Sequence, residues 1–204
     1  DFSRPEIGSF DQPVIGHDGS IYMGTHRGLY ALRSDGTIKW VAREDVQFYN
    51  PSLSSKSDII VAGVVGERTT LYSASLYSFA SDGSLNWVYE KDPDCQEITI
   101  SFAPVIDTQG TIYIGDRLIN SGYNGYLRAI NADGTLKWRY AVNNPTGLGV
   151  TVFPPAIGYC NRLYFVGDLN SAGPELANVL YALDEDLDGG VPDCQYPDVG
   201  YDDV

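Results

Sequence analysis

Short stretches rich in β-branched and aromatic residues recur along the whole chain, separated by polar residues and glycine. Examples are Ile21–Gly24, Ile112–Gly115 and Leu163–Val166. Apolar and polar positions alternate with the two-residue period that is typical of β-strands. No window shows the 3.6-residue period, with capping residues, that an amphipathic helix requires. The pattern therefore predicts an all-β protein with essentially no helix.

One hairpin pattern occurs three times at nearly constant spacing. The copies begin with Leu-Tyr-Ala-Leu, Leu-Tyr-Ser-Phe and Leu-Arg-Ala-Ile, and each continues with Asp-Gly and a strand that ends in tryptophan. A fourth copy begins at Val179 and diverges after Asp184. The glycine after aspartate supplies the positive φ that a tight hairpin turn needs. We expect structural roles in the repeat for these glycines and tryptophans, which are Gly36, Gly83, Gly134, Trp40, Trp87 and Trp138.

A second shared segment, which contains proline and leads into an Ile/Tyr strand, precedes each hairpin. Together the two segments make a unit of four short strands, and 204 residues divide into four units of about 51 residues, the size of a propeller blade. The sequence predicts one domain over residues 1–204, a β-propeller of four blades, each a four-stranded antiparallel sheet. The predicted units are 10–47, 48–101, 102–152 and 153–190, and 184–204 is an acidic C-terminal segment.

The pattern Leu-Tyr-Ala-Leu, Asp-Gly, Trp resembles the repeat of the pyrroloquinoline-quinone-type (PQQ-like) β-propeller proteins, from about Phe10 to Asp186. That repeat occurs in quinoprotein dehydrogenases and in an envelope scaffold that helps to assemble outer-membrane proteins, and these propellers usually close seven or eight blades. Quinone-binding members carry a vicinal disulfide, a tryptophan floor, calcium ligands and a catalytic aspartate. This chain has no adjacent cysteine pair, and its three tryptophans occupy equivalent repeat positions. We therefore expect no catalytic residue and no bound PQQ.

The net charge of the chain limits the kinds of molecule that it is expected to bind. The chain has 27 Asp and Glu against 13 Lys and Arg, a net charge of −14, which disfavours nucleic acid and anionic membrane surfaces. No apolar stretch approaches the roughly 18 residues of a membrane helix, so we expect no membrane insertion. The acidic, lysine-poor composition favours an extracellular or cell-envelope location. The first residues are neither an initiator methionine nor a signal peptide, so we expect a processed chain whose signal peptide is not included.

An acidic loop replaces the simple Asp-Gly turn in the fourth unit. Asp184, Asp186 and Asp188 stand at positions 1, 3 and 5, with glycine at position 6, as in the first half of an EF-type calcium loop. Position 12 is Gln195 instead of the usual glutamate. We predict a Ca²⁺ site formed by Asp184, Asp186, Asp188, Gly190 and Asp193. The alternative is a solvated acidic turn and tail.

The three cysteines do not have metal-binding spacing. Cys95 and Cys194 share the context Pro-Asp-Cys-Gln, which indicates related loops and a disulfide between them. Cys160 is an alternative partner, and three free thiols are the other alternative.

The fourth unit lacks a tryptophan strand. Its last strand must come from residues 191–204, from Asp1–Ile7 or from a neighbouring molecule, and an unfilled sheet edge invites strand addition. We therefore expect a non-catalytic extracellular structural protein, stabilised by Ca²⁺, that self-assembles into a filament or matrix or docks to an envelope or matrix protein. The alternatives are a fragment of a quinoprotein dehydrogenase and a carbohydrate- or peptide-binding module.

Overall fold

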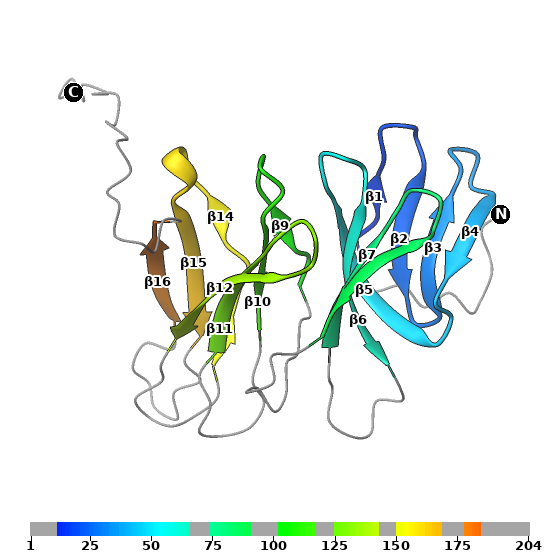
Figure 1. Ribbon diagram of the computed structural model, residues 1–204. Coiled ribbons are helices and arrows are strands. Elements are labelled where there is room, and N and C mark those ends of the chain that lie inside the picture. The colour runs from blue at the N-terminus through cyan, green and yellow to red at the C-terminus, as the bar shows by residue number, and fades with distance from the viewer. Residues whose placement is uncertain are drawn as a thin grey trace, which may run out of the picture.

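A computed structural model describes residues 12–65, 74–90, 102–116, 125–142, 150–168 and 178–184. These residues form four antiparallel sheets of four strands each, which stand side by side (Figure 1). The all-β class and the four propeller blades are thereby confirmed. The described ranges contain no α-helix, and their single helical element is the three-residue 3-10 turn Tyr159–Asn161. None of their helices is long and apolar enough to span a membrane.

Sheets 1, 2 and 3 each follow the chain order from first to fourth strand. Sheet 1 contains β1 (Val14–Ile15), β2 (Ile21–Thr25), β3 (Gly28–Leu32) and β4 (Ile38–Ala42). Sheet 2 contains β5 (Val46–Leu53), β6 (Ile59–Val65), β7 (Ala74–Phe79) and β8 (Leu85–Tyr89). Sheet 3 contains β9 (Val105–Ile106), β10 (Ile112–Gly115), β11 (Gly125–Ile130) and β12 (Leu136–Val142).

Sheet 4 differs at both of its edges. It contains β13 (Thr151–Val152), β14 (Ala156–Ile157), β15 (Leu163–Asp168) and β16 (Asn178–Leu183). Both β13 and β14 pair with β15, so they form one first strand that is interrupted at Pro154 and Pro155, which lack the N–H of a ladder. On the other side β16 pairs with β15, and the described residues provide no counterpart of β4, β8 and β12.

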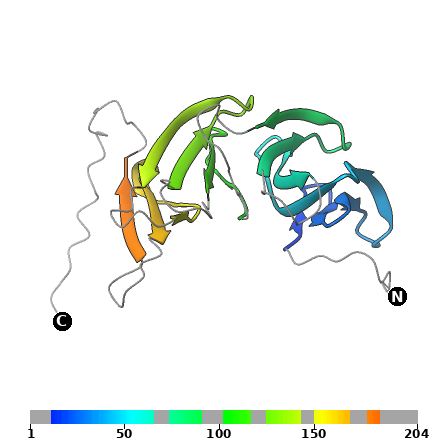
Figure 2. The same ribbon diagram turned by 90° about the horizontal axis from the view of Figure 1, so that it is seen from below.

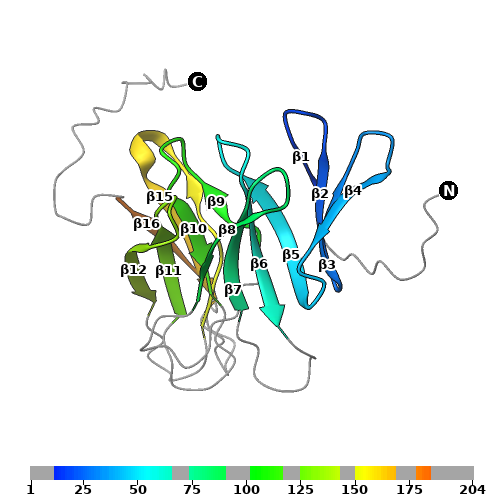
Figure 3. The ribbon, with the colours of Figure 1, turned by 45° about the vertical axis from the view of Figure 1, so that its right-hand side comes forward.

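The hairpins between third and fourth strands share one turn geometry. Gly36, Gly83 and Gly134 have φ values of 82°, 91° and 88°, and each is followed by a register shift at the same place in the hairpin. A glycine in the left-handed region followed by a bulge is a common way to close such a loop. These turns lie at the same end of the molecule as the turns between first and second strands, the upper end in Figure 3.

The sheets pack face to face in an open arc, with sheet 1 and sheet 4 at opposite ends (Figure 2). Three apolar clusters fill the spaces between consecutive sheets. The fully buried residues between sheets 1 and 2 include Leu29, Ala31, Phe48 and Val61. Each sheet in the middle of the arc therefore buries both of its faces.

Candidate functional site

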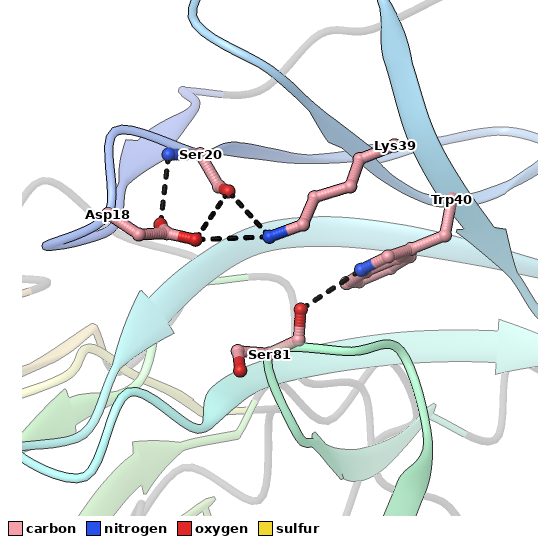
Figure 4. Close-up of polar contacts among 5 residues, drawn as sticks. All are labelled: Asp18, Ser20, Lys39, Trp40 and Ser81. Atoms are coloured by element: carbon pink, nitrogen blue, oxygen red, sulfur yellow. Dashed lines mark hydrogen bonds and ion pairs between the residues drawn. The ribbon is translucent and has the colours of Figure 1, made fainter.

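Tryptophan side chains link each of the first two sheets to the next one. Trp40, on β4, donates from Nε1 to the carbonyl oxygen of Ser81 at 3.0 Å, as Figure 4 shows. Trp87, on β8, donates in the same way to Ala132 at 3.0 Å. Ser81 and Ala132 occupy the same place in the turn between the third and fourth strands of the following sheet. The repeat tryptophans therefore join neighbouring sheets through their turns.

The glycine of each receiving turn lies directly beneath the indole ring. A Cβ atom at Gly83 would lie 2.9 Å from Cδ2 of Trp40, and one at Gly134 would lie 2.6 Å from Cδ2 of Trp87. Both distances are too short for carbon atoms that are not bonded. Glycine is thus required at these two positions for its positive φ and also for the space it leaves to the ring.

Trp138, on β12, has no such partner among the described residues. Its Nε1–H is buried and donates to no acceptor among them. Alignment of the repeats places Glu185 where Ser81 and Ala132 stand, and Glu185 lies outside the described residues.

The aspartates of the Asp-Gly turns are engaged within their own turns. Asp82 Oδ1 accepts hydrogen bonds from the backbone N–H of Ser84 at 2.9 Å and from its hydroxyl at 2.6 Å. Asp35 and Asp133 make the equivalent bonds to Thr37 and Thr135. These bonds stabilise the charged form and hold the pKa values of the three carboxyl groups below their usual range. Their geometry supports a structural role in the turn.

Asp18 forms a further polar cluster in sheet 1 (Figure 4). Its carboxylate accepts hydrogen bonds from the backbone N–H of Ser20 at 3.0 Å, from the Ser20 hydroxyl at 2.8 Å and from Lys39 Nζ at 3.0 Å. The backbone N–H of Ser20 is the largest of the causes that lower the pKa of Asp18 to about 2. The cluster ties the turn before β2 to the fourth strand of the same sheet.

Of the predicted calcium ligands, the structure describes Asp184 alone. Its Oδ1 atom accepts a hydrogen bond from Nε of Arg162 at 2.6 Å, so a cation at this carboxylate would compete with a guanidinium group. Within the described ranges no three His, Cys, Asp or Glu side chains gather in a way that could hold a metal ion. The remaining predicted ligands, Asp186, Asp188, Gly190 and Asp193, lie outside the described residues.

The cysteine prediction also lies outside the part of the chain that the structure describes. Cys95 and Cys194 fall in undescribed segments, and only the backbone of Cys160 is described, in the 3-10 turn. The disulfide between Cys95 and Cys194 therefore stays a prediction.

A buried ion pair in sheet 3 escaped the sequence analysis. Arg128, on β11, pairs with Asp116, which follows β10, and both side chains are almost fully buried. Asp116 also accepts the backbone N–H of Tyr126 at 2.7 Å, and the Arg128 guanidinium lies over the Tyr126 ring. The signal was present in the repeat, because the other three units have tyrosine in place of Arg128, at Tyr30, Tyr77 and Tyr181.

The outward face of sheet 4 exposes the residues that sheets 1 to 3 bury. Leu180 is 70% exposed, whereas its counterparts in the repeat, Leu29, Leu76 and Leu127, are completely buried. Tyr164 is 36% exposed, whereas Tyr22, Ile60 and Tyr113 at the equivalent positions are buried. Ala182, on the same face, is also exposed. An apolar sheet face that no sheet of the described residues covers is a candidate site for contact with a protein.

Comparison with known proteins finds similarity in fold alone. No protein-family model and no curated protein matches the chain. A solved structure of a protein of unknown function from Bacteroides caccae is 12% identical, with a TM-score of 0.51 over 85% of this chain and 60% of that one. The quinohemoprotein alcohol dehydrogenase ADHIIG from Pseudomonas putida HK5 is 18% identical, with a TM-score of 0.58 over 79% of this chain and 28% of that one.

The chain thus spans 60% and 28% of the lengths of these two proteins. At such low identity the likeness concerns the fold and carries no activity. The four sheets have a fold similar to that of a PQQ-type β-propeller.

Proposed function

We propose that this chain is a non-catalytic structural β-propeller of the cell exterior or envelope that works by binding other protein surfaces. The observation that carries the proposal is the outward face of sheet 4. Leu180, Tyr164 and Ala182 are exposed there, although the same repeat positions are buried in every preceding sheet. Burying a leucine side chain is worth about 1.5–3 kcal/mol, so a partner that covers this face gains substantial binding energy. The acidic composition supports the extracellular location.

The rival proposal is a quinone-dependent enzyme, which the fold likeness to a quinohemoprotein alcohol dehydrogenase brings forward. To separate the two, the chain is incubated with PQQ and CaCl₂, desalted, and examined for a retained near-ultraviolet band and for dye-linked oxidation of an alcohol. We expect neither a retained band nor turnover. A stoichiometric band with turnover would overturn the non-catalytic function.

Calcium is the second element of the proposal. It is supported by the spacing of Asp184, Asp186 and Asp188, although the ion pair of Asp184 with Arg162 would compete with a cation at that carboxylate. We expect the thermal midpoint to fall when Ca²⁺ is removed with EGTA, because a ligand bound to the folded state stabilises it. The double variant Asp186→Asn, Asp188→Asn should have the thermal midpoint of the EGTA-treated wild-type chain, whether or not Ca²⁺ is present. An EGTA-insensitive wild-type chain would remove calcium from the proposal.

A further inference from the structure

We infer that the partner of the sheet 4 face is sheet 1 of a second copy of this chain, bound head to tail. This inference rests on the proposed function and names the partner of the same face. Its basis is that the two ends of the arc carry the two complementary halves of the interface that already joins the sheets inside one chain.

The internal interfaces share one pair of residues. In each, a leucine from the third strand of the earlier sheet joins the same apolar cluster as an isoleucine or leucine from the first strand of the later sheet. The pairs are Leu29 with Leu53, Leu76 with Ile106, and Leu127 with Ile157. Continuing the series gives Leu180 of sheet 4 with Ile15 of sheet 1.

Leu180 and Ile15 are the two members of this series that lack such a partner among the described residues. Leu180 is 70% exposed and Ile15 is 67% exposed, the two largest exposures among the large apolar side chains of the described residues. Leu180 belongs to β16 and Ile15 to β1, and the sheets that contain these two strands stand at the two ends of the arc (Figure 2). The interface between two copies would therefore repeat a contact that the sequence already makes three times.

Other positions of the two faces follow the same rule. Ile21 and Met23 of sheet 1 are half-buried, whereas Ile59 and Val61 of sheet 2, at the equivalent positions, are fully buried against sheet 1. On sheet 4, Tyr164 is half-exposed at the position where Tyr113 of sheet 3 is buried against sheet 4. Both terminal faces are thus apolar in the pattern of an internal face, and both are incompletely covered.

A head-to-tail contact is heterologous, since the two copies use different surfaces. Such a contact gives a closed ring when the rotation between copies closes, and an open filament when it does not. In either case each copy uses its sheet 4 once and its sheet 1 once. This property can be tested by blocking one face at a time.

The test uses two variants of the full chain, Leu180→Asp, which blocks the sheet 4 face, and Ile15→Asp, which blocks the sheet 1 face. Sedimentation velocity over a concentration series measures assembly. We expect the wild-type chain to associate and each variant alone to associate at least about tenfold more weakly, because an unpaired carboxylate is buried in an apolar contact. A mixture of the two variants should form a one-to-one dimer, because each supplies the face that the other has lost.

The matched control is Val65→Asp, at the end of β6, where the side chain is also exposed but belongs to sheet 2, which is not one of the two terminal sheets of the arc. It should associate as the wild-type chain does. Near-ultraviolet circular dichroism shows whether each variant is folded, and Leu180→Gln with Ile15→Gln replaces any aspartate variant that is not.

A wild-type chain that stays monomeric would overturn the inference, and if it also binds no PQQ the structural function would stand with a different partner. Association of Ile15→Asp alone at wild-type strength, with no one-to-one dimer in the mixture, would show a symmetric contact instead and would also overturn it.

Discussion

At the scale of single residues, a tryptophan of one sheet packs directly against a turn glycine of the next sheet. Gly134 has a φ of +88° and would place a Cβ atom 2.6 Å from Cδ2 of Trp87. Gly19 has a similar φ of +77°, but a Cβ atom there would meet nothing within 4 Å. Substitutions at these two positions therefore distinguish the cost of a left-handed backbone, which both share, from the cost of displacing the indole, which only Gly134 has.

We predict that Gly134→Ala destabilises the chain more than Gly19→Ala. In the Gly19 variant the only cost is that of placing an alanine in the left-handed region, which lowers the unfolding free energy by about 1–2 kcal/mol. The Gly134 variant also displaces the Trp87 ring, which adds about 1–3 kcal/mol of overpacking. Urea unfolding of the two variants and the wild-type chain measures the difference. Equal losses would show that the indole does not depend on the glycine.

The carboxyl group of Asp18 gives a pH prediction. Its pKa is lowered to about 2 by the backbone N–H of Ser20 and by Lys39. Because the folded-state pKa is below the unfolded value of about 3.9, the stabilisation from this group is complete above pH 4 and is lost as the pH falls towards 2. Carbon-detected NMR titration should give a pKa of about 2 for Asp18.

The variant Lys39→Met controls for the ammonium group. It should raise the pKa of Asp18 but leave it below 3.9, because the N–H of Ser20 remains. A pKa of Asp18 near 3.9 in the wild-type chain would contradict the hydrogen-bonded cluster of Figure 4.

At the scale of strands and sheets, the buried pair of Arg128 and Asp116 distinguishes sheet 3 from its neighbours. Both charges lie away from water, and each depends on the other to offset the cost of its desolvation. Sheet 1 has uncharged residues at the same two positions, with Tyr30 in place of Arg128 and Thr25 in place of Asp116. The repeat therefore offers its own replacement for the pair.

We predict that Asp116→Thr alone costs about 3–5 kcal/mol of unfolding free energy, because it leaves the guanidinium buried without its carboxylate. The double variant Asp116→Thr, Arg128→Tyr should recover most of that loss. A double-mutant cycle from urea unfolding measures the coupling. Additive losses would show that the two side chains act independently.

Strand content and the four-sheet architecture were predictable because they depend on local signals. Two-residue alternation, Asp-Gly turns and a repeat of about 51 residues are all present in short windows of sequence. The interruption in the first strand of sheet 4 was harder to predict from the sequence, because similar proline-containing segments behave differently. In sheet 2 a single bulged strand, β5, runs through Phe48-Tyr49-Asn50-Pro51. In sheet 4 the segment Phe153-Pro154-Pro155 separates two strands, β13 and β14.

The candidate site was less predictable than the fold. Arg128 was visible as a departure from tyrosine in the repeat, but its burial depends on a partner from another strand. The exposure of Leu180 depends on whether a fifth sheet follows sheet 4 in space. Its local sequence, Val-Leu-Tyr-Ala-Leu, is almost that of the buried copies. Repetition therefore reveals which residues face a neighbouring sheet, and the structure reveals which of them have one.

At the scale of the whole molecule, the sheets form a one-dimensional array in which each contacts its neighbours. Such arrays are usually closed by terminal units with a polar outer face, which keep the array soluble. The two outer sheets of the described arc expose apolar residues instead, at Ile15 and Leu180, and the chain has a net charge of −14. In the proposed assembly, association of copies would be favoured by apolar contact and opposed by long-range repulsion between like charges.

We predict that added salt strengthens the association of the wild-type chain. Raising NaCl from about 20 mM to about 300 mM shortens the screening length from roughly 20 Å to about 6 Å, which weakens the repulsion between the acidic copies. The proposed apolar contact between Leu180 and Ile15 of two copies would not be weakened by screening. Sedimentation equilibrium at the two salt concentrations should show a lower dissociation constant at the higher one.

The Leu180→Asp variant is the control for this measurement, since it should associate weakly at both salt concentrations. An association that salt weakens would point to ion pairs across the interface in place of the apolar faces. The direction of the salt effect therefore tests which force joins the copies, and it does so without altering a residue of the wild-type interface.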